Sequence, residues 1–170
     1  IFSIMIEEGI LDEVFPPIEI EGLSKVITAE KKYSVSPSHL VRLFSLNKSI
    51  GKKWAHYVSL TSNEAKMLEF IKESLAHYND LKTVAYKFGR GVAEGWLLNF
   101  HDGSFDVIPS KMSEIINTGC NAFFPISGVD LLEEMEEGPE LGRQMERLEK
   151  LWIKSGFKMS KEELLSKSKS

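Results

Sequence analysis

The apolar residues of this chain recur three and four positions apart in nearly every segment, and this spacing limits the chain to helical folds. In residues 62–78 the predicted apolar stripe consists of Ala65, Leu68, Phe70, Ile71 and Leu75. A half-buried β-strand would need apolar and polar residues to alternate, and no alternating run exceeds three or four residues. The pattern therefore predicts an all-α protein with no substantial sheet.

Capping residues, prolines and glycines divide this helical pattern into short pieces. Thr61 with Glu64, and Ser127 with Asp130, have the spacing of capping boxes, in which each residue satisfies a free N–H of the other. Asp80 is predicted to cap the next helix and Gly89 to end it in a left-handed conformation. We expect helices over residues 1–15, 21–33, 36–46, 50–58, 62–78, 81–88, 91–100, 111–119, 128–135 and 139–155, then a final turn capped by Ser160 and Glu163 and a frayed tail. The result is an irregular multi-helix array of about eight to ten short helices.

Length, cysteine content and charge narrow the class of protein. A chain of 170 residues suits one domain with a small addition, and a single cysteine excludes an internal disulfide framework. No apolar run approaches the roughly 20 residues that span a bilayer, so we expect a cytoplasmic protein without a membrane partner. The net charge of −4 by itself argues mildly against a nucleic-acid partner.

The chain begins with Ile1, inside a helical pattern that has no N-cap. A helix that starts in this way is expected in a fragment of a longer protein. The alternative is a mature protein from which a leading segment has been removed.

No arrangement of residues in the sequence predicts a catalytic or metal site. The histidines are scattered without metal-ligand spacing, and Cys120 is a nucleophile only if a histidine lies beside it in space. Asp102 and Asp106 lie in a glycine-containing turn, where aspartate is favoured for its geometry alone. Gly89 and Gly91 lie between two helices, which is the wrong context for a dinucleotide-binding loop. We therefore expect no catalytic residue and no metal ligand in this chain.

The distribution of charge is more informative than its total. Residues 31–58 contain six lysines and arginines and no acidic residue, whereas residues 130–149 contain eight acidic residues. A basic surface of this kind neutralises the phosphates of a nucleic-acid backbone without reading bases. The candidate RNA-binding residues are Arg42, Lys48, Lys52, Lys53, Lys82, Lys87 and Arg90. Charge alone slightly favours the alternative, in which these residues form an ordinary solvated helical face.

The last third of the chain carries a specific resemblance. Residues 124–165 are similar to the C-terminal segment of bacterial tRNA nucleotidyltransferases, the CCA-adding and poly(A) polymerase family. The matching positions are Pro125, Gly128, Asp130, Leu131, Gly138, Pro139, Gly142, Trp152, Leu164 and Leu165. Residues 6–16 and the middle of the chain match the same family more loosely.

This resemblance implies a helical body over residues 1–122, including the end of the neck, and a helical tail over residues 123–170. In the family, catalysis belongs to an N-terminal head with a Gly-Ser pair followed by Asp-x-Asp, and nucleotide choice belongs to a neck motif Glu-Asp-x-x-Arg. This sequence contains neither motif. The resemblance therefore implies a non-catalytic fragment that holds tRNA by its acceptor and T-arm backbone. Mg²⁺ and CTP or ATP would be bound only by the head.

The partners expected on this interpretation are tRNA and, in cis, the head and neck of the parent enzyme, with a homodimer left open. Lys48, Lys52 and Lys53 are the residues whose reversal to glutamate is expected to weaken tRNA binding. The residues Gly138-Pro139 and Ser160 with Glu163 are expected to fix helices, and Trp96 and Trp152 to lie in the core. The alternative function is a helical protein-interaction or dimerisation module, which would use the acidic residues 130–149 and the opening helix.

Overall fold

The computed structural model describes residues 4–5, 8–11, 13–100, 109–132 and 138–168. Within these ranges the chain forms ten helices and no strand, so the predicted all-α multi-helix array is confirmed. The chain divides into two compact units, Ile1–Asn121 (unit 1) and Ala122–Ser170 (unit 2). None of the described helices is both long enough and apolar enough to cross a membrane.

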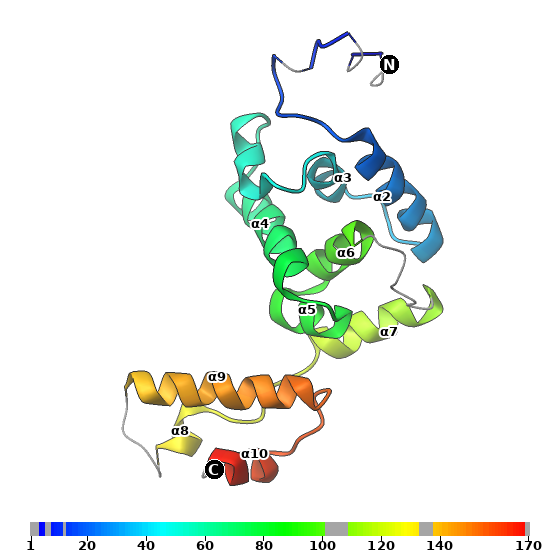
Figure 1. Cartoon of the computed structure of the whole chain (residues 1–170). Helices are drawn as coiled ribbons and strands as arrows, with labels where there is room; N and C mark the ends of the chain where they lie inside the picture. Colours follow the sequence, from blue (N-terminus) through cyan, green and yellow to red (C-terminus); the bar gives the residue numbers. More distant parts are fainter. Residues whose placement is uncertain (1–3, 6–7, 12, 101–108, 133–137, 169–170) are drawn as a thin grey trace. The chain divides into compact units, whose positions relative to one another are not determined.

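Unit 1 is organised around one central helix. Its helices are α2 (Ile20–Tyr33), α3 (His39–Leu46), the 3-10 helix η1 (Gly51–His56), α4 (Ser62–His77), α5 (Leu81–Phe88), α6 (Arg90–Asn99) and α7 (Pro109–Cys120). Helix α6 packs against α2, α3, α4, α5 and α7, and Figure 1 shows it in the middle of this group. Seven of its ten residues are buried, which is typical of a helix enclosed by others.

Two contacts between α6 and α4 explain how closely these helices approach. A Cβ atom on Gly95 would stand 2.6 Å from Cδ1 of Ile71, so only glycine fits at this crossing. Trp96 is fully buried, and its Nε1–H donates to the backbone oxygen of Ser74 at 3.2 Å. The prediction that Trp96 belongs to the core is confirmed.

Unit 2 consists of α8 (Gly128–Leu131), α9 (Pro139–Lys154) and α10 (Lys161–Ser168), with α9 packed against both of the others. Trp152 is buried at 4% exposure, as predicted, and its ring lies 5.6 Å from that of Phe124 and 4.8 Å from that of Phe157. Pro139 occupies the first turn of α9, where its missing N–H costs no hydrogen bond.

The three predicted capping pairs are present, and Asp80 caps α5 as predicted, its Oδ2 accepting from the backbone N–H of Thr83 at 2.7 Å. Thr61 and Glu64 form a full capping box, and the backbone N–H of Ser127 donates to Oδ2 of Asp130 at 2.9 Å. The backbone N–H of Ser160 donates to Glu163 at 2.8 Å, and that of Glu163 donates to Oγ of Ser160 at 3.3 Å. These caps begin α4, α8 and α10.

Several local predictions are wrong, each for an identifiable reason. From the Ser36-Pro37 pair the sequence predicts that Ser36 caps the helix that follows, but α3 is capped by Ser38, whose side chain accepts from the N–H of Val41. Residues 51–56 are a 3-10 helix, and residues 8–11 and 13–15 form turns, with Gly9 at a φ of +67°.

Two helix ends also differ from the prediction. Gly89 has a positive φ of 82° but a ψ of 177°, because it caps α6 as well as ending α5, so it is not left-handed helical. The last helix continues to Ser168, further than the single capped turn expected from the sequence.

Candidate nucleic-acid interface

Lys52 and Lys53 are presented to solvent by the short helix η1. Gly51 begins this helix with a φ of +49°, a conformation that favours glycine. Trp54 is fully buried and anchors η1 in the core, which leaves both preceding lysines exposed. Both residues were candidates from the sequence, and η1 holds them side by side.

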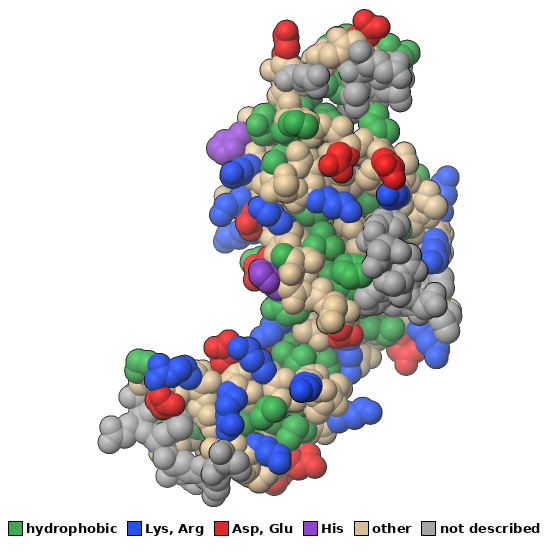
Figure 2. Space-filling model, in the orientation of Figure 1, with side chains coloured by type: hydrophobic (Ala, Val, Ile, Leu, Met, Phe, Trp, Pro, Cys, Tyr) green, Lys and Arg blue, Asp and Glu red, His purple; other side chains and the backbone are tan. Residues whose placement is uncertain are grey.

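Helix α4 brings a third lysine to the same place. The backbone N–H of Lys52 donates to Oε2 of Glu69 at 3.1 Å. A Cβ atom on Gly51 would stand 3.0 Å from Cδ of Lys72, so the Lys72 side chain passes directly beside η1. We call Lys52, Lys53 and Lys72 the η1 basic surface. Figure 2 shows blue side chains gathered near the α4 edge of unit 1.

Sequence reasoning missed Lys72, and no local signal identifies it. It lies on a helix with mixed charge, outside the acid-free stretch, and it reaches the surface of η1 only because α4 packs against that helix. Glu69 approaches by the same packing, so the surface contains one carboxylate among three ammonium groups. Clustered lysines of this kind attract phosphate groups.

Arg42 has a structural partner that the sequence did not reveal. Its Nη2 donates to Oε2 of Glu30 at 2.7 Å, and its Nε lies 3.2 Å from both carboxylate oxygens. Glu30 is only 4% exposed, and this hydrogen bond raises the pKa of Arg42. The pair joins α2 to α3, and a buried carboxylate would be left uncompensated if Arg42 turned towards RNA.

Lys48 is likewise turned inward. Its Nζ donates to the backbone oxygen of Asn99 at 2.7 Å, at the C-terminal end of α6. A cation is favourable there because the last carbonyls of a helix lack partners. Burial lowers the pKa of Lys48 below its usual value. The residue holds the segment after α3 against α6.

The remaining candidates lie on α5 and at the start of α6. Nη1 of Arg90 donates to Glu94 at 3.0 Å, and Nη2 contacts Oδ1 of Asn117. Lys87 is exposed, with its ammonium 5.5 Å from the ring centre of Tyr86. Lys82 lines a cavity of about 250 Å³ together with Lys111 and Glu114. The seven candidates therefore fall into three groups. Arg42 and Lys48 are engaged within unit 1, Lys52 and Lys53 lie on η1, and the other three lie on α5 and at the start of α6.

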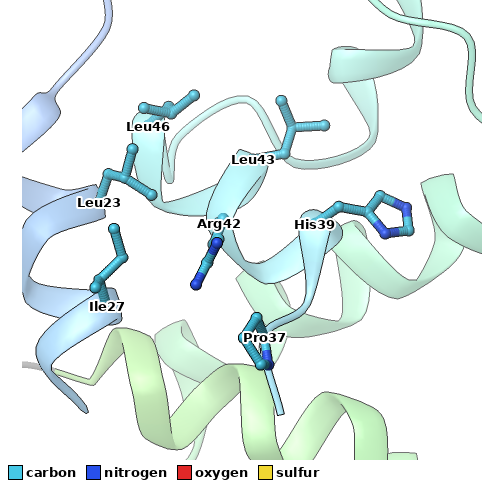
Figure 3. Close-up of a pocket in the computed structure, with 7 residues that line it drawn as sticks. All are labelled: Leu23, Ile27, Pro37, His39, Arg42, Leu43 and Leu46. Atoms are coloured by element: carbon cyan, nitrogen blue, oxygen red, sulfur yellow. The ribbon is translucent and has the colours of Figure 1, made fainter. Parts of the chain in front are cut away.

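A groove between α2 and α3 is the larger cavity, with a volume of about 570 Å³. Its residues are Leu23, Ile27, Pro37, His39, Arg42, Leu43 and Leu46 (Figure 3). The helical spacing of residues 21–33 predicts that Leu23 and Ile27 are buried, but in the structure both are half-buried and line this groove. Nε2 of His39 lies 3.3 Å from Oε1 of Glu64, and no serine, cysteine or lysine is among the described residues that line the groove.

The residues considered for catalysis or metal binding do not gather in the part of the chain that the structure describes. No cluster of three or more histidine, cysteine or acidic residues suited to a metal ion occurs there. Cys120 is exposed, and its Sγ–H donates weakly to the backbone oxygen of Ala85 at 3.7 Å. His101, Asp102 and Asp106 lie outside the described residues.

The residues that carry the resemblance in unit 2 have identifiable structural roles. Leu131 and Leu164 are buried, and Nζ of Lys161 donates to Oδ1 of Asp130 at 2.6 Å, joining α10 to α8. The hydrogen bonds from Lys161 and Ser127 lower the pKa of Asp130 to about 2. Comparison with protein-family models, with curated proteins and with solved structures gives no match for this chain.

Proposed function

We propose that this chain is the tRNA-binding C-terminal region of a template-independent nucleotidyltransferase of the CCA-adding and poly(A) polymerase family. In this role it holds tRNA and leaves catalysis to a head domain that the chain does not include. The observation that carries the binding role is the η1 basic surface, where three lysines from two helices meet beside Gly51 with one carboxylate among them. The resemblance of residues 124–165 supports the choice of family.

The physical match is with an A-form RNA helix. Its bases are inaccessible in the deep, narrow major groove, so proteins recognise it mainly through shape, phosphates and 2′-hydroxyl groups. Exposed lysines on rigid helices suit this task, because a compact ammonium group approaches a phosphate from many directions. Neither Arg42 nor Lys48 is needed for it, since each already has a partner inside unit 1.

The rest of the reaction lies outside this chain on the same proposal. The head and neck of the parent enzyme would join it in cis and bind Mg²⁺ and CTP or ATP. The parent enzyme would act in the cytoplasm, where tRNA is processed. Incorporation of CTP or ATP into tRNA by this chain alone would contradict its non-catalytic role.

The binding role is tested by reversing charge on the η1 basic surface. We expect Lys52→Glu with Lys53→Glu to weaken binding of a tRNA minihelix about tenfold or more at low salt. Because each lost phosphate contact reduces the slope of log K against log salt by about 1, the double change should reduce it by about 2. Filter binding at a series of salt concentrations measures both quantities. Lys72→Glu should act in the same direction.

The matched control is Lys31→Glu with Lys32→Glu, which changes the net charge equally on two exposed residues in the last turn of α2. We expect this control to bind nearly as tightly as the natural chain. An equal loss in both double variants would mean that binding follows net charge, and the proposed surface would be wrong. Unchanged binding in the η1 variant would also exclude it.

A second candidate function is protein interaction or dimerisation, and one observation favours it. In unit 2, Phe123 is 86% exposed and Val129 is 72% exposed, which is unusual for large apolar side chains. The acidic residues 133, 134, 136 and 137 of this region lie outside the described residues. Sedimentation at several concentrations tests this candidate, because Phe123→Ser with Val129→Ser should then abolish any self-association.

A further inference from the structure

Three aromatic rings, those of Phe70, Tyr78 and Phe88, form a cluster where α4 meets the end of α5, and Phe70 is the exposed member. Phe70 on α4 is 40% exposed, although the sequence pattern placed it in the buried stripe of that helix. From its geometry and charge we infer that this cluster stacks an unpaired nucleobase of RNA. The inference rests on the proposed function and adds a contact that duplex RNA does not use.

The rings are held by three separate parts of unit 1. The centres of the Phe70 and Phe88 rings lie 5.4 Å apart with their planes 41° apart, and Tyr78 meets Phe88 edge-on at 5.5 Å. Met67, one turn before Phe70, approaches the start of α6, because a Cβ atom on Gly91 would stand 3.3 Å from its methyl group. Phe70 therefore packs against Phe88 on one side and keeps 40% of its surface exposed to solvent.

Exposed cations lie close in the sequence to these rings. Lys66 is exposed one helical turn before Phe70, Lys87 is exposed beside Phe88, and Arg90 follows two residues later. On α4 the exposed Glu73 follows Phe70 by three residues, and Glu69, which directly precedes Phe70, turns its carboxylate to η1. Glu94 is paired with Arg90. An aromatic ring with a free face among cations is the arrangement with which proteins bind single-stranded nucleic acid.

The chemistry favours a base over an apolar side chain of a protein partner. Stacking on an aromatic ring is available to every base, and the flanking phosphates of the nucleotide would meet Lys66 and Lys87. An apolar protein partner would have to desolvate these cations without compensating them. A single-stranded segment of RNA is therefore the occupant that uses both parts of the cluster.

The test compares two RNA hairpins, one with a blunt end and one with a short single-stranded extension. In the natural chain the extension should tighten binding about tenfold, which is within the range measured for one stacked base. Phe70→Leu keeps an apolar side chain of similar size but removes the ring face, so it should lose this gain and leave binding of the blunt hairpin unchanged. The control Phe123→Leu, which removes an exposed ring in unit 2, should keep the gain.

The outcomes separate this inference from the proposed function. If neither hairpin binds the natural chain, the proposed function fails and the inference fails with it. If the blunt hairpin binds but the extension adds nothing, or if Phe70→Leu keeps the gain, only the inference is overturned. Equal weakening of both hairpins by Phe70→Leu would also overturn it, because the residue would then act on the duplex or on the fold.

Discussion

The two units of this protein are stabilised in different ways. Unit 1 encloses α6 among five other helices, and its buried cluster contains twenty apolar residues. Among the described residues of unit 2, the buried apolar side chains are Ile126, Leu131, Leu148, Trp152 and Leu164. A segment of about fifty residues buries little surface on folding. Unit 2 therefore depends more heavily on one tryptophan and on its polar caps.

The substitution with the largest expected effect on stability tests this difference between the two units directly. Trp152→Ala should cost about 3–5 kcal/mol, which is comparable to the whole stability of so small a unit. We expect α8–α10 to lose protection from hydrogen exchange while α2–α7 keep theirs. Hydrogen exchange followed by mass spectrometry measures the two units separately in the full chain.

The matching change in unit 1 is Trp96→Ala. It removes a fully buried ring of the same kind, but the surrounding core is larger, so unit 1 should remain folded with a lower midpoint of unfolding. Loss of protection in both units after Trp152→Ala would show that they unfold together, and the comparison would then be wrong.

Substitution of Gly119 or Gly142 by alanine is expected to change the free energy of unfolding by a smaller amount. A Cβ atom on Gly119 would stand 2.3 Å from the backbone oxygen of Lys82, so Gly119→Ala must push α7 away from α5 and should cost about 1–3 kcal/mol. Gly142 has no atom within 4 Å of the same position, and Gly142→Ala in α9 should stabilise unit 2 by about 0.5–1 kcal/mol. Chemical denaturation of both variants measures whether the first change lowers the free energy of unfolding and the second raises it. Destabilisation by Gly142→Ala would contradict the exposed setting of that helix face.

The smallest effect is a dependence of stability on acid at the contact between α8 and α10 of unit 2. The pKa of Asp130 is lowered from 3.8 to about 2 by its hydrogen bonds to Lys161 and Ser127. The folded state therefore binds this proton less readily than the unfolded state, so the contribution to stability is complete above pH 3.8 and is lost as the pH falls towards 2. Amide resonances of α10, followed by NMR during acidification, should report this loss.

Asp130→Asn is the control for the acid effect. It keeps the shape of the side chain but removes the titrating group, so unit 2 should be less stable at neutral pH and less sensitive to acid. The lowered pKa of Glu162 leaves some sensitivity in the variant. If the variant keeps the full acid response, other carboxyl groups are responsible.

A second comparison concerns lysines and arginines of one acid-free stretch. Arg42 and Lys48 are engaged by Glu30 and by the end of α6, whereas Lys52 and Lys53 remain exposed on η1. All four lie in the same acid-free stretch of sequence, so the sequence analysis predicted that all four belong to the RNA-binding surface. The distinction comes from residues distant in the chain. Glu30 and Asn99 engage Arg42 and Lys48, whereas Glu69 and Lys72 lie beside η1, which carries Lys52 and Lys53.

The fold was largely predictable because helices are encoded locally. The spacing of apolar residues, the capping pairs Thr61–Glu64 and Ser127–Asp130 and the position of Pro139 all act within one or two turns. The errors occurred where a local pattern allowed more than one outcome. Ser36 and Ser38, on either side of Pro37, could each cap α3, and Gly9 could either continue a helix or turn the chain.

The sequence by itself determined the helical class, most helix boundaries and the burial of Trp96 and Trp152. Tertiary structure alone decided that Lys72 joins Lys52 and Lys53, that Arg42 and Lys48 are turned inward, and that Phe70 is exposed beside Phe88. The physical reason is the distance along the chain between the residues that interact. A cap or an apolar stripe depends on residues a few positions away, whereas a binding surface depends on which helices pack together, and that is set by the shape of the whole core.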